Sequence, residues 1–168
     1  MSSNKVLIEP EQSQLGIELK IFDYHESETG VLHVPFRYTT KELSRLKNGL
    51  QIQFETISPK QARGDHYHYP EYAGEEFYLL KGKVVLLAKN INDDKYELYA
   101  LKKKISYYVP AYIAHKLINY SEIDAEIIIS KFFNYAIKNQ QVKYFIDENA
   151  VKEELSMLVA DKWGEIPV

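Results

Sequence analysis

Two histidines separated by one residue, His66 and His68, are the side chains of this sequence best suited to binding a metal ion. If they lie on a β-strand, they project from the same face, about 6 to 7 Å apart. At that spacing two imidazoles can converge on one ion above the sheet, while Tyr67 and Tyr69 face the other side. The pair alone fits a structural role equally well, so a metal site is predicted only if further ligands accompany it.

A carboxylate and a third histidine follow the pair, each where a further strand is expected to begin. Glu75 opens one of these strands, and His115 opens the other after a turn at Pro110. Both side chains can reach an ion held by the first two histidines. Three neutral imidazoles and one carboxylate suit Mn, Fe, Co, Ni or Zn, and the sequence does not choose among these metals. We assign no role to His25 or His33, which stand alone.

Together these residues resemble the two motifs of the cupin superfamily. The first motif, His-x-His, a spacer, Glu, six residues and Gly, matches His66, His68, Glu75 and Gly82. The second motif, Pro, four residues, His, three residues and Asn, matches Pro110, His115 and Asn119. The resemblance covers about residues 51–133. It implies an all-β fold, the cupin double-stranded β-helix (jelly-roll barrel), with one divalent transition metal ion on His66, His68, Glu75 and His115.

The sequence departs from the usual cupin pattern at two places. The spacer between His68 and Glu75 is six residues where three or four are usual, so that Glu71 and Glu76 are rival ligands. Glu71 does not fit the six-residue run to the motif glycine, and Glu76 would project from the opposite face of its strand. Ile113 stands where a Gly is common. Neither departure removes a ligand, and Glu75 remains the expected carboxylate.

Within the superfamily, the sequence is similar to the cupin-type phosphoglucose isomerases. These enzymes share the long spacer, the Lys81-Gly82 that follows it, and the stretch Tyr108–Asn119. They usually carry Lys and Thr before the first motif and a Tyr two residues after the metal-binding Glu. Here Arg63-Gly64-Asp65 and Phe77 occupy those places, and the phosphate-binding threonines have no clear counterpart.

The sequence also resembles cupins of polysaccharide and nucleotide-sugar biosynthesis, among them deoxysugar ketoisomerases and epimerases. The run Ser58–His68 has their Ser, Arg-Gly and His-x-His in order. Many of those isomerases lack a full metal set and use a His as base. Both groups act on carbohydrates, so the resemblance implies a sugar or sugar phosphate as the substrate.

The resemblance implies proton transfer beside a sugar carbonyl as the reaction. Glu75 is the first candidate base if it releases the metal, and Tyr112 is the second. Arg63 and Lys116 are candidates for a phosphate contact, with a solvated edge charge as the alternative for both. Asn119, on the face of His115, is a further candidate for contacting the substrate.

We expect a metal-dependent sugar-phosphate isomerase of the aldose–ketose type, as in glucose-6-phosphate isomerase. A nucleotide-sugar ketoisomerase or epimerase is the alternative from the same resemblance. A metal-dependent dioxygenase and a non-enzymatic sugar-binding cupin stay open as other classes.

The elements that must position these residues are mostly short β-like runs separated by turn residues. Candidate strands lie at 18–24, 31–38, 51–58, 62–69, 75–80, 84–89, 95–101, 105–109, 115–120 and 125–133, with a hairpin tip at Asn92–Asp94. A short helix is predicted near 40–47 after a capping box, and a C-terminal helix near 150–163 with Asn149 as its cap. The apolar stripe of the second helix comprises Val151, Leu155, Leu158, Val159 and Trp163.

Composition places the chain among ordinary globular proteins. Its 168 residues are 45% hydrophobic and 27% charged, and they predict a single domain over 1–168. The net charge of −3 gives no case for nucleic acid or an anionic membrane as a partner. Cysteine is absent, which excludes disulfides and thiolate ligands. We predict a cytoplasmic protein without signal peptide or membrane span, and a homodimer, since cupins commonly pair through their outer strands.

Overall fold

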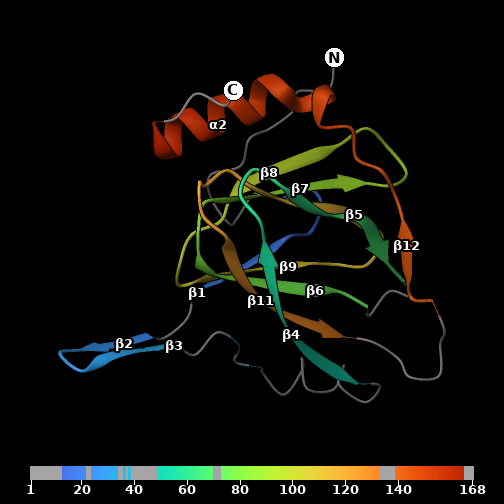
Figure 1. Cartoon of the computed structure of the whole chain (residues 1–168). Helices are drawn as coiled ribbons and strands as arrows, with labels where there is room; N and C mark the ends of the chain where they lie inside the picture. The colour runs from blue at the N-terminus through green and yellow to red at the C-terminus, as the bar shows by residue number, and fades with distance from the viewer. Residues whose placement is uncertain are drawn as a thin grey trace.

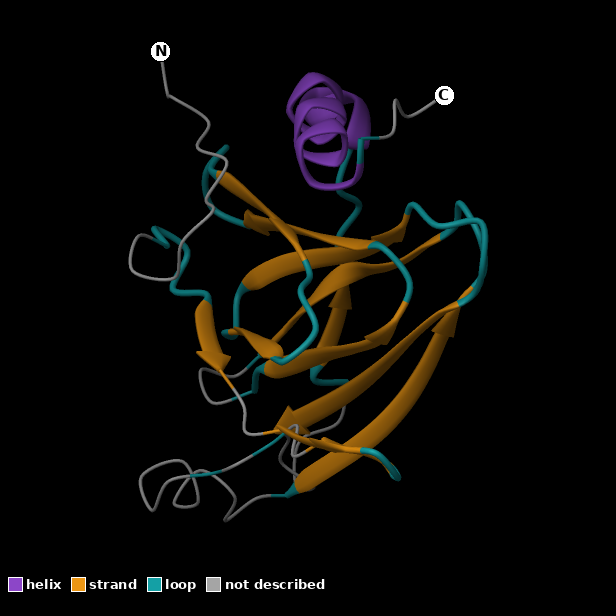
Figure 2. Ribbon diagram, turned by 90° about the vertical axis from the view of Figure 1, so that its left-hand side faces the viewer, coloured by secondary structure: helices purple, strands orange, loops and turns teal. Residues whose placement is uncertain are grey.

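Two antiparallel β-sheets face each other and form a barrel, with one helix lying across its outside (Figures 1 and 2). This computed structural model describes residues 13–21, 24–33, 36, 38, 49–69, 73–132 and 139–164. The architecture is the cupin jelly roll that the motifs predict. The short helix predicted near 40–47 lies outside the described residues.

The first sheet has the strand order β1-β9-β6-β11-β4. Its strands are β1 (Glu18–Ile21), β9 (Ile105–Val109), β6 (Glu75–Lys81), β11 (Ala125–Phe132) and β4 (Leu50–Ile57). The second sheet has the order β12-β5-β10-β7-β8. Its strands are β12 (Gln141–Lys143), β5 (Ala62–His68), β10 (Ile113–Asn119), β7 (Val84–Asn90) and β8 (Tyr96–Ala100).

A separate hairpin of β2 (Tyr24–Ser27) and β3 (Gly30–His33) projects from the barrel in Figure 1. The run predicted as one strand over 18–24 thus contributes to two strands of different sheets. The hairpin predicted at Asn92–Asp94 is confirmed, because β7 and β8 pair on either side of it. Strand β12 has no counterpart among the predicted strands.

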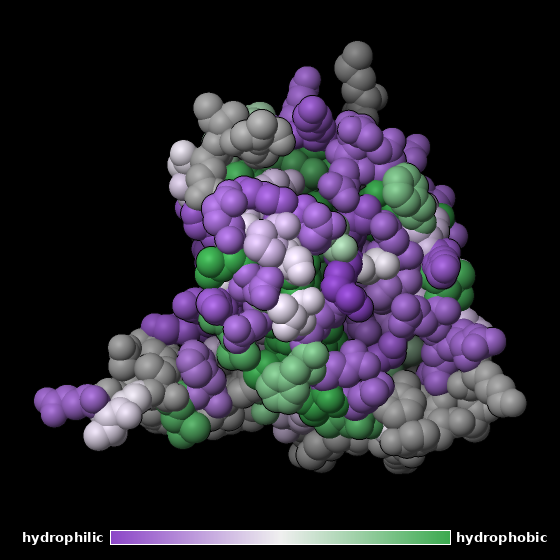
Figure 3. All heavy atoms as spheres, in the orientation of Figure 1, coloured by the Kyte–Doolittle hydropathy of each residue, from purple (hydrophilic) through white to green (hydrophobic). Residues whose placement is uncertain are grey.

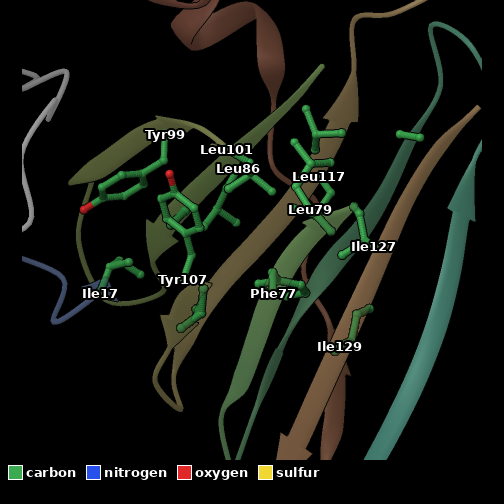
Figure 4. Close-up of a cluster of buried hydrophobic side chains, with 14 of the residues drawn as sticks. Ile17, Phe77, Leu79, Leu86, Tyr99, Leu101, Tyr107, Leu117, Ile127 and Ile129 are labelled. Carbon is green, nitrogen blue, oxygen red and sulfur yellow. The ribbon is translucent and has the colours of Figure 1, made fainter. Parts of the chain in front are cut away.

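The main core lies between the two sheets, where inward-pointing residues of strands in both sheets pack together (Figure 4). Phe77, Leu79, Ile127 and Ile129 come from the first sheet, and Leu117 from the second. All five side chains are buried. A fully buried aliphatic or aromatic side chain contributes about 1.5–3 kcal/mol. This core therefore fixes the spacing of the sheets, and with it the residues at the end of the core.

The C-terminal helix is confirmed and packs on the outer face of the second sheet. A 3-10 turn, η2 (Glu148–Val151), leads into α2 (Lys152–Trp163), whose Leu155, Leu158 and Val159 are buried against that face. The predicted cap Asn149 is wrong: Asp147 accepts the backbone N–H of Asn149 at 3.0 Å. The helix ends at Gly164, whose φ of 66° is a conformation that glycine adopts without strain.

Hydrophilic residues cover much of the face drawn in Figure 3, with apolar residues in smaller groups between them. Within the described ranges, no helix has the length and apolar character needed to span a membrane. The cytoplasmic location, the homodimer and the single-domain boundary stay predictions.

Candidate metal centre

Three strands from both sheets bring the four predicted ligands together. His66 and His68 lie on β5, His115 lies on the neighbouring β10, and Glu75 is the first residue of β6 in the facing sheet. One potential ligand atom from each residue lies within 4.8 Å of the others. An ion at this place would be enclosed between the two sheets, with His68, Glu75 and His115 buried.

The Glu75 carboxylate is the centre of this cluster. His115 Nε2 lies 3.0 Å from its Oε2, His68 Nε2 lies 3.1 Å from its Oε1, and His66 Nε2 lies 3.7 Å from its Oε2. His115 Nδ1 is 3.1 Å from the carbonyl oxygen of Ile113, to which it can donate. A hydrogen bond at Nδ1 leaves Nε2 free to bind a metal, the usual arrangement in metal sites.

Several nitrogen atoms of the cluster are buried without a hydrogen bond. Nε2 of His66 and both ring nitrogens of His68 lack a well-oriented hydrogen bond, although His68 Nε2 and His66 Nε2 lie 3.1 Å and 3.7 Å from the Glu75 carboxylate. Buried polar atoms normally have a partner, because losing water without a replacement costs free energy. A cation would bind one nitrogen of each imidazole together with the Glu75 carboxylate, and three imidazoles with one carboxylate are a common donor set for a transition metal. The residues therefore fit the predicted ion.

The protonation states favoured by the site are those that metal ligands need. Burial by itself raises the pKa of Glu75, but the surrounding His115, His66 and His68 outweigh it and hold that pKa well below its usual range. Burial lowers the pKa of His68, although Glu75 opposes this change. Glu75 is therefore a carboxylate, and His68 a neutral imidazole, at neutral pH.

A cavity of about 220 Å³ opens beside the cluster. Its apolar wall includes Phe77, Leu117 and Ile129, three of the core residues labelled in Figure 4. Its polar lining, apart from the ligands, consists of Gln53, Glu55, Arg63, Lys131 and Gln141. A small cavity with both kinds of wall suits a polar molecule about the size of one ring.

Lys131 is the most notable residue of the cavity that was absent from the prediction. Its Nζ lies 3.4 Å from Glu75 Oε1 and 3.2 Å from Gln141 Oε1. The signal was present in the sequence, since Lys131 continues the inward parity of Ile127 and Ile129 on a strand expected to be buried. A lysine at an inward position needs a partner, and a carboxylate in a site is the simplest one. Glu55 and Gln53 likewise line the cavity from β4 and were not predicted.

Of the predicted substrate contacts, only Arg63 lies at the cavity. Its guanidinium forms an ion pair with Glu55, and its side chain is 63% exposed. Tyr112 does not line the cavity; its φ is 64°, and its backbone N–H donates to the carbonyl of His68 at 2.8 Å. Tyr112 is thus a turn residue on the path into β10.

Lys116 and Asn119 are held elsewhere by other contacts. Lys116 Nζ donates to Ile146 O at 3.0 Å and to Glu148 at 2.9 Å, on the face opposite His115. Asn119 Nδ2 donates to backbone carbonyls, including that of Ile57 at 2.9 Å. The structure does not bring either side chain to the cavity, and Asn119 instead joins loops at the end of the barrel.

The choice of Glu75 over its neighbour follows the strand parity that was predicted. Glu76 points to the other face of β6, where its carboxylate accepts a hydrogen bond from Ser106 and lies 3.8 Å from Lys20 Nζ. The other rival, Glu71, lies outside the described residues.

Comparison with known proteins places this chain in a family. Residues 33–143, more than half of the chain, match the model of the polysaccharide biosynthesis C-terminal domain. A search of curated proteins finds no match. Among solved structures, the epimerase RmlC of Legionella pneumophila, in complex with dTDP-4-keto-L-rhamnose, shares 17% identity at a TM-score of 0.60, over 76% of this chain and 71% of that one.

Two further structures have the same fold. The sugar 3,4-ketoisomerase QdtA of Thermoanaerobacterium thermosaccharolyticum, in complex with TDP, shares 14% identity at a TM-score of 0.56, over 84% of this chain and 96% of that one. The capsular polysaccharide assembling protein CapF of Staphylococcus aureus shares 21% identity at a TM-score of 0.51, over 57% of this chain. The match covers 26% of CapF. These likenesses concern the fold, which is that of RmlC-like cupins; from the family match, the chain belongs to the polysaccharide biosynthesis C-terminal domain family.

Proposed function

We propose that this protein is a metal-dependent cupin that epimerises or isomerises the sugar of a nucleotide sugar. The observation that carries the proposal is the convergence of three imidazoles and one carboxylate within 4.8 Å, beside a partly polar cavity. The family match supports a role in polysaccharide biosynthesis. RmlC, which has the same fold, is named as a dTDP-6-deoxy-D-glucose-3,5-epimerase, and QdtA as a sugar 3,4-ketoisomerase whose structure holds TDP.

The size of the cavity agrees with this class of substrate. At about 220 Å³ it is smaller than the roughly 300–1,000 Å³ of pockets for drug-sized ligands. One sugar ring would occupy it, and the nucleotide would remain at the mouth. Arg63, half in solvent at that mouth, is placed to meet a phosphate once it exchanges its partner Glu55.

His66, His68, Glu75 and His115 would hold the metal ion. Bound there, a divalent ion supplies Lewis acidity that polarises a carbonyl group. Because Glu75 holds the ion in this proposal, it is not free to act as the base, and the other carboxylate of the cavity, Glu55, takes that part.

In the proposed reaction, the bond between hydrogen and the carbon next to the carbonyl breaks. The proton goes to the carboxylate of Glu55, and the electron pair moves toward the carbonyl oxygen. The Lys131 ammonium faces the same cavity and stabilises the negative charge on that oxygen. Protonation of the same carbon by water from the other face of the ring gives an epimer. Return of the proton from Glu55 to the former carbonyl carbon, with loss of the hydroxyl proton from the first carbon to water, gives a ketoisomer.

The alternative from the sequence, an aldose–ketose isomerase of a sugar phosphate, would use the same proton transfer. The family match favours the nucleotide sugar over it. A metal-free version, in which one histidine is the base, is a second alternative within the nucleotide-sugar class.

Proton exchange in deuterated water tests the proposal. The zinc-loaded protein is incubated with TDP-4-keto-6-deoxyglucose, a ligand of the QdtA structure, and separately with glucose 6-phosphate. We expect deuterium at carbons next to the ketone of the nucleotide sugar, and none in glucose 6-phosphate. Exchange only in glucose 6-phosphate would favour the sugar-phosphate isomerase, and unchanged exchange in the chelator-treated protein would favour the metal-free base. Exchange in neither substrate would refute the proposal.

A further inference from the structure

Strand β5 contains one extra residue where it passes the metal centre. His115 of β10 pairs with His66, but the next residue of β10, Lys116, pairs with Gly64. Asp65 between them has no partner on β10, which is a β-bulge, and its φ is 60°.

The bulge changes which side chains of β5 face the cavity. In a regular strand, residues at even spacing share a face, so Arg63 and His66 would point in opposite directions. With one residue inserted, both line the cavity, and His68 follows His66 on the same face. The bulge is therefore the reason that the ligand pair and the mouth arginine belong to one site.

Two residues of the bulge have conformations that few side chains tolerate. Gly64 has a φ of 123°, and a Cβ there would lie 2.5 Å from the carbonyl oxygen of His115. Asp65 is in the left-handed region, which Asp and Asn enter at less cost than most residues. These requirements explain the Gly-Asp that precedes His66.

The bulge is held from behind by a buried lysine. Lys116 Nζ lies 3.0 Å from Asp65 Oδ1, and the Lys116 side chain is 5% exposed. Asp65 Oδ1 also accepts the backbone N–H of Ile146 at 2.9 Å, and the Asp65 carbonyl accepts that of Tyr144 at 2.8 Å. The remaining bonds of Lys116 go to Ile146 O and Glu148. The segment that leads to α2 is thus tied to the bulge.

We propose that Lys116 and Asp65 are positioning residues, a clamp that sets the orientation of His66 relative to His115 and so the affinity of the metal centre. Each is next in sequence to one of these two ligands, and the clamp joins them on the outer side of the sheet. The proposal rests on the proposed metal site for its effect on affinity. Its effect on the two imidazoles is independent of any metal.

The test compares Asp65→Gly with Asp65→Asn. Both residues accept a positive φ, but only Asn keeps an oxygen that can bond Lys116 and the Ile146 N–H. Zinc affinity is measured by chelator competition, and the proximity of the His66 and His115 rings, whose centroids lie 4.6 Å apart, by nuclear Overhauser effects in metal-free protein. For Asp65→Gly we expect weaker Overhauser effects between the rings and an affinity about 10- to 100-fold lower, as for other residues that orient metal ligands.

Asp65→Asn should keep the proximity of the rings and most of the affinity. Lys116→Met should resemble Asp65→Gly. Lys60→Met, which removes a lysine from the exposed pair with Glu122, should leave both quantities unchanged. If Asp65→Gly and Lys116→Met lower the melting temperature but keep the ring proximity and the affinity, the clamp is only structural and the proposal is overturned. If wild type binds no zinc while Asp65→Gly still separates the two rings, the metal site is refuted and the clamp stands.

Discussion

Lys131 Nζ lies 3.4 Å from Glu75 Oε1, and the two residues are direct partners in the pairing of β11 with β6. A fixed cation therefore lies beside the carboxylate that the proposed metal ion needs. Glu75 would thus contact both the bound metal ion and Lys131. The ion would supply Lewis acidity at the site, and the Lys131 ammonium would stabilise the negative charge that develops on the substrate oxygen.

Lys131→Met separates these tasks. Removing the ammonium removes a competitor for Glu75, so zinc should bind as tightly as in wild type or more tightly. Proton exchange in the nucleotide sugar should fall by about 100- to 1,000-fold, the usual effect of losing one group that stabilises developing charge. Chelator competition and the exchange assay measure the two quantities. Lys81→Met, which removes a lysine from the exposed pair with Glu126, is the matched control. If Lys131→Met lowered zinc affinity as well as proton exchange, the separate roles of Lys131 and the metal ion would be contradicted.

Glu75→Gln tests the chosen carboxylate. The amide keeps the shape of the side chain but cannot supply an anionic oxygen. Losing a residue that only orients a metal ligand lowers affinity by up to roughly 100-fold, and we expect the loss of a ligand to lower zinc affinity by more than that. Glu76→Gln, one residue away on the other face, should keep the affinity. Equal zinc binding by Glu75→Gln and wild type would show that the carboxylate is not a ligand.

Stability of the metal-free protein should decrease as the pH falls below 6.5. Burial lowers the pKa of His68 from its ordinary 6.5, so the unfolded chain takes up this proton before the folded one. The contribution of neutral His68 is complete above pH 6.5 and is lost as the pH falls through the folded value, by at most about 1.4 kcal/mol per pH unit.

Urea unfolding of metal-free wild type and His68→Gln over a range of pH measures how the free energy of unfolding depends on pH. The difference in the free energy of unfolding between the two proteins should shrink as the pH falls. A difference that stays constant would mean that His68 does not titrate in this range.

Asn119→Ala should affect stability and leave metal binding unchanged. Its side chain is buried and bonds the carbonyls of Ile57 and Ile123, each at 2.9 Å, so its loss leaves buried acceptors unpaired. We expect about 1–3 kcal/mol less stability in urea unfolding. Asn92→Ala, on an exposed turn, should stay within about 0.5 kcal/mol of wild type. If Asn119→Ala had wild-type stability but bound the nucleotide sugar more weakly, the result would support the original prediction that Asn119 contacts the substrate.

The sequence was enough to predict the barrel and the four converging side chains, because strand parity and motif spacing are local properties. The choice of Glu75 over Glu76 needed only the alternation of one strand. What could not be predicted was which residue of one strand lies opposite a given residue of its partner strand. Lys131 faces Glu75 because β11 pairs with β6 in one register, and no local pattern specifies that register.

Lys116 is a residue whose side chain does not lie where its predicted role requires. From its place after His115 it was a candidate for a phosphate contact, yet neighbours on a strand point to opposite faces, and its partners Asp65 and Glu148 come from segments far apart in the chain. The bulge at Asp65 was equally hidden, since a bulge is defined by the partner strand as much as by its own residues.

The metal content of the purified protein tests the central claim most directly. Elemental analysis of wild type beside His66→Ala/His68→Ala should find about one transition-metal ion per chain in wild type and almost none in the double variant. Metal in both proteins, or in neither after reconstitution with zinc, would contradict a metal centre on these residues.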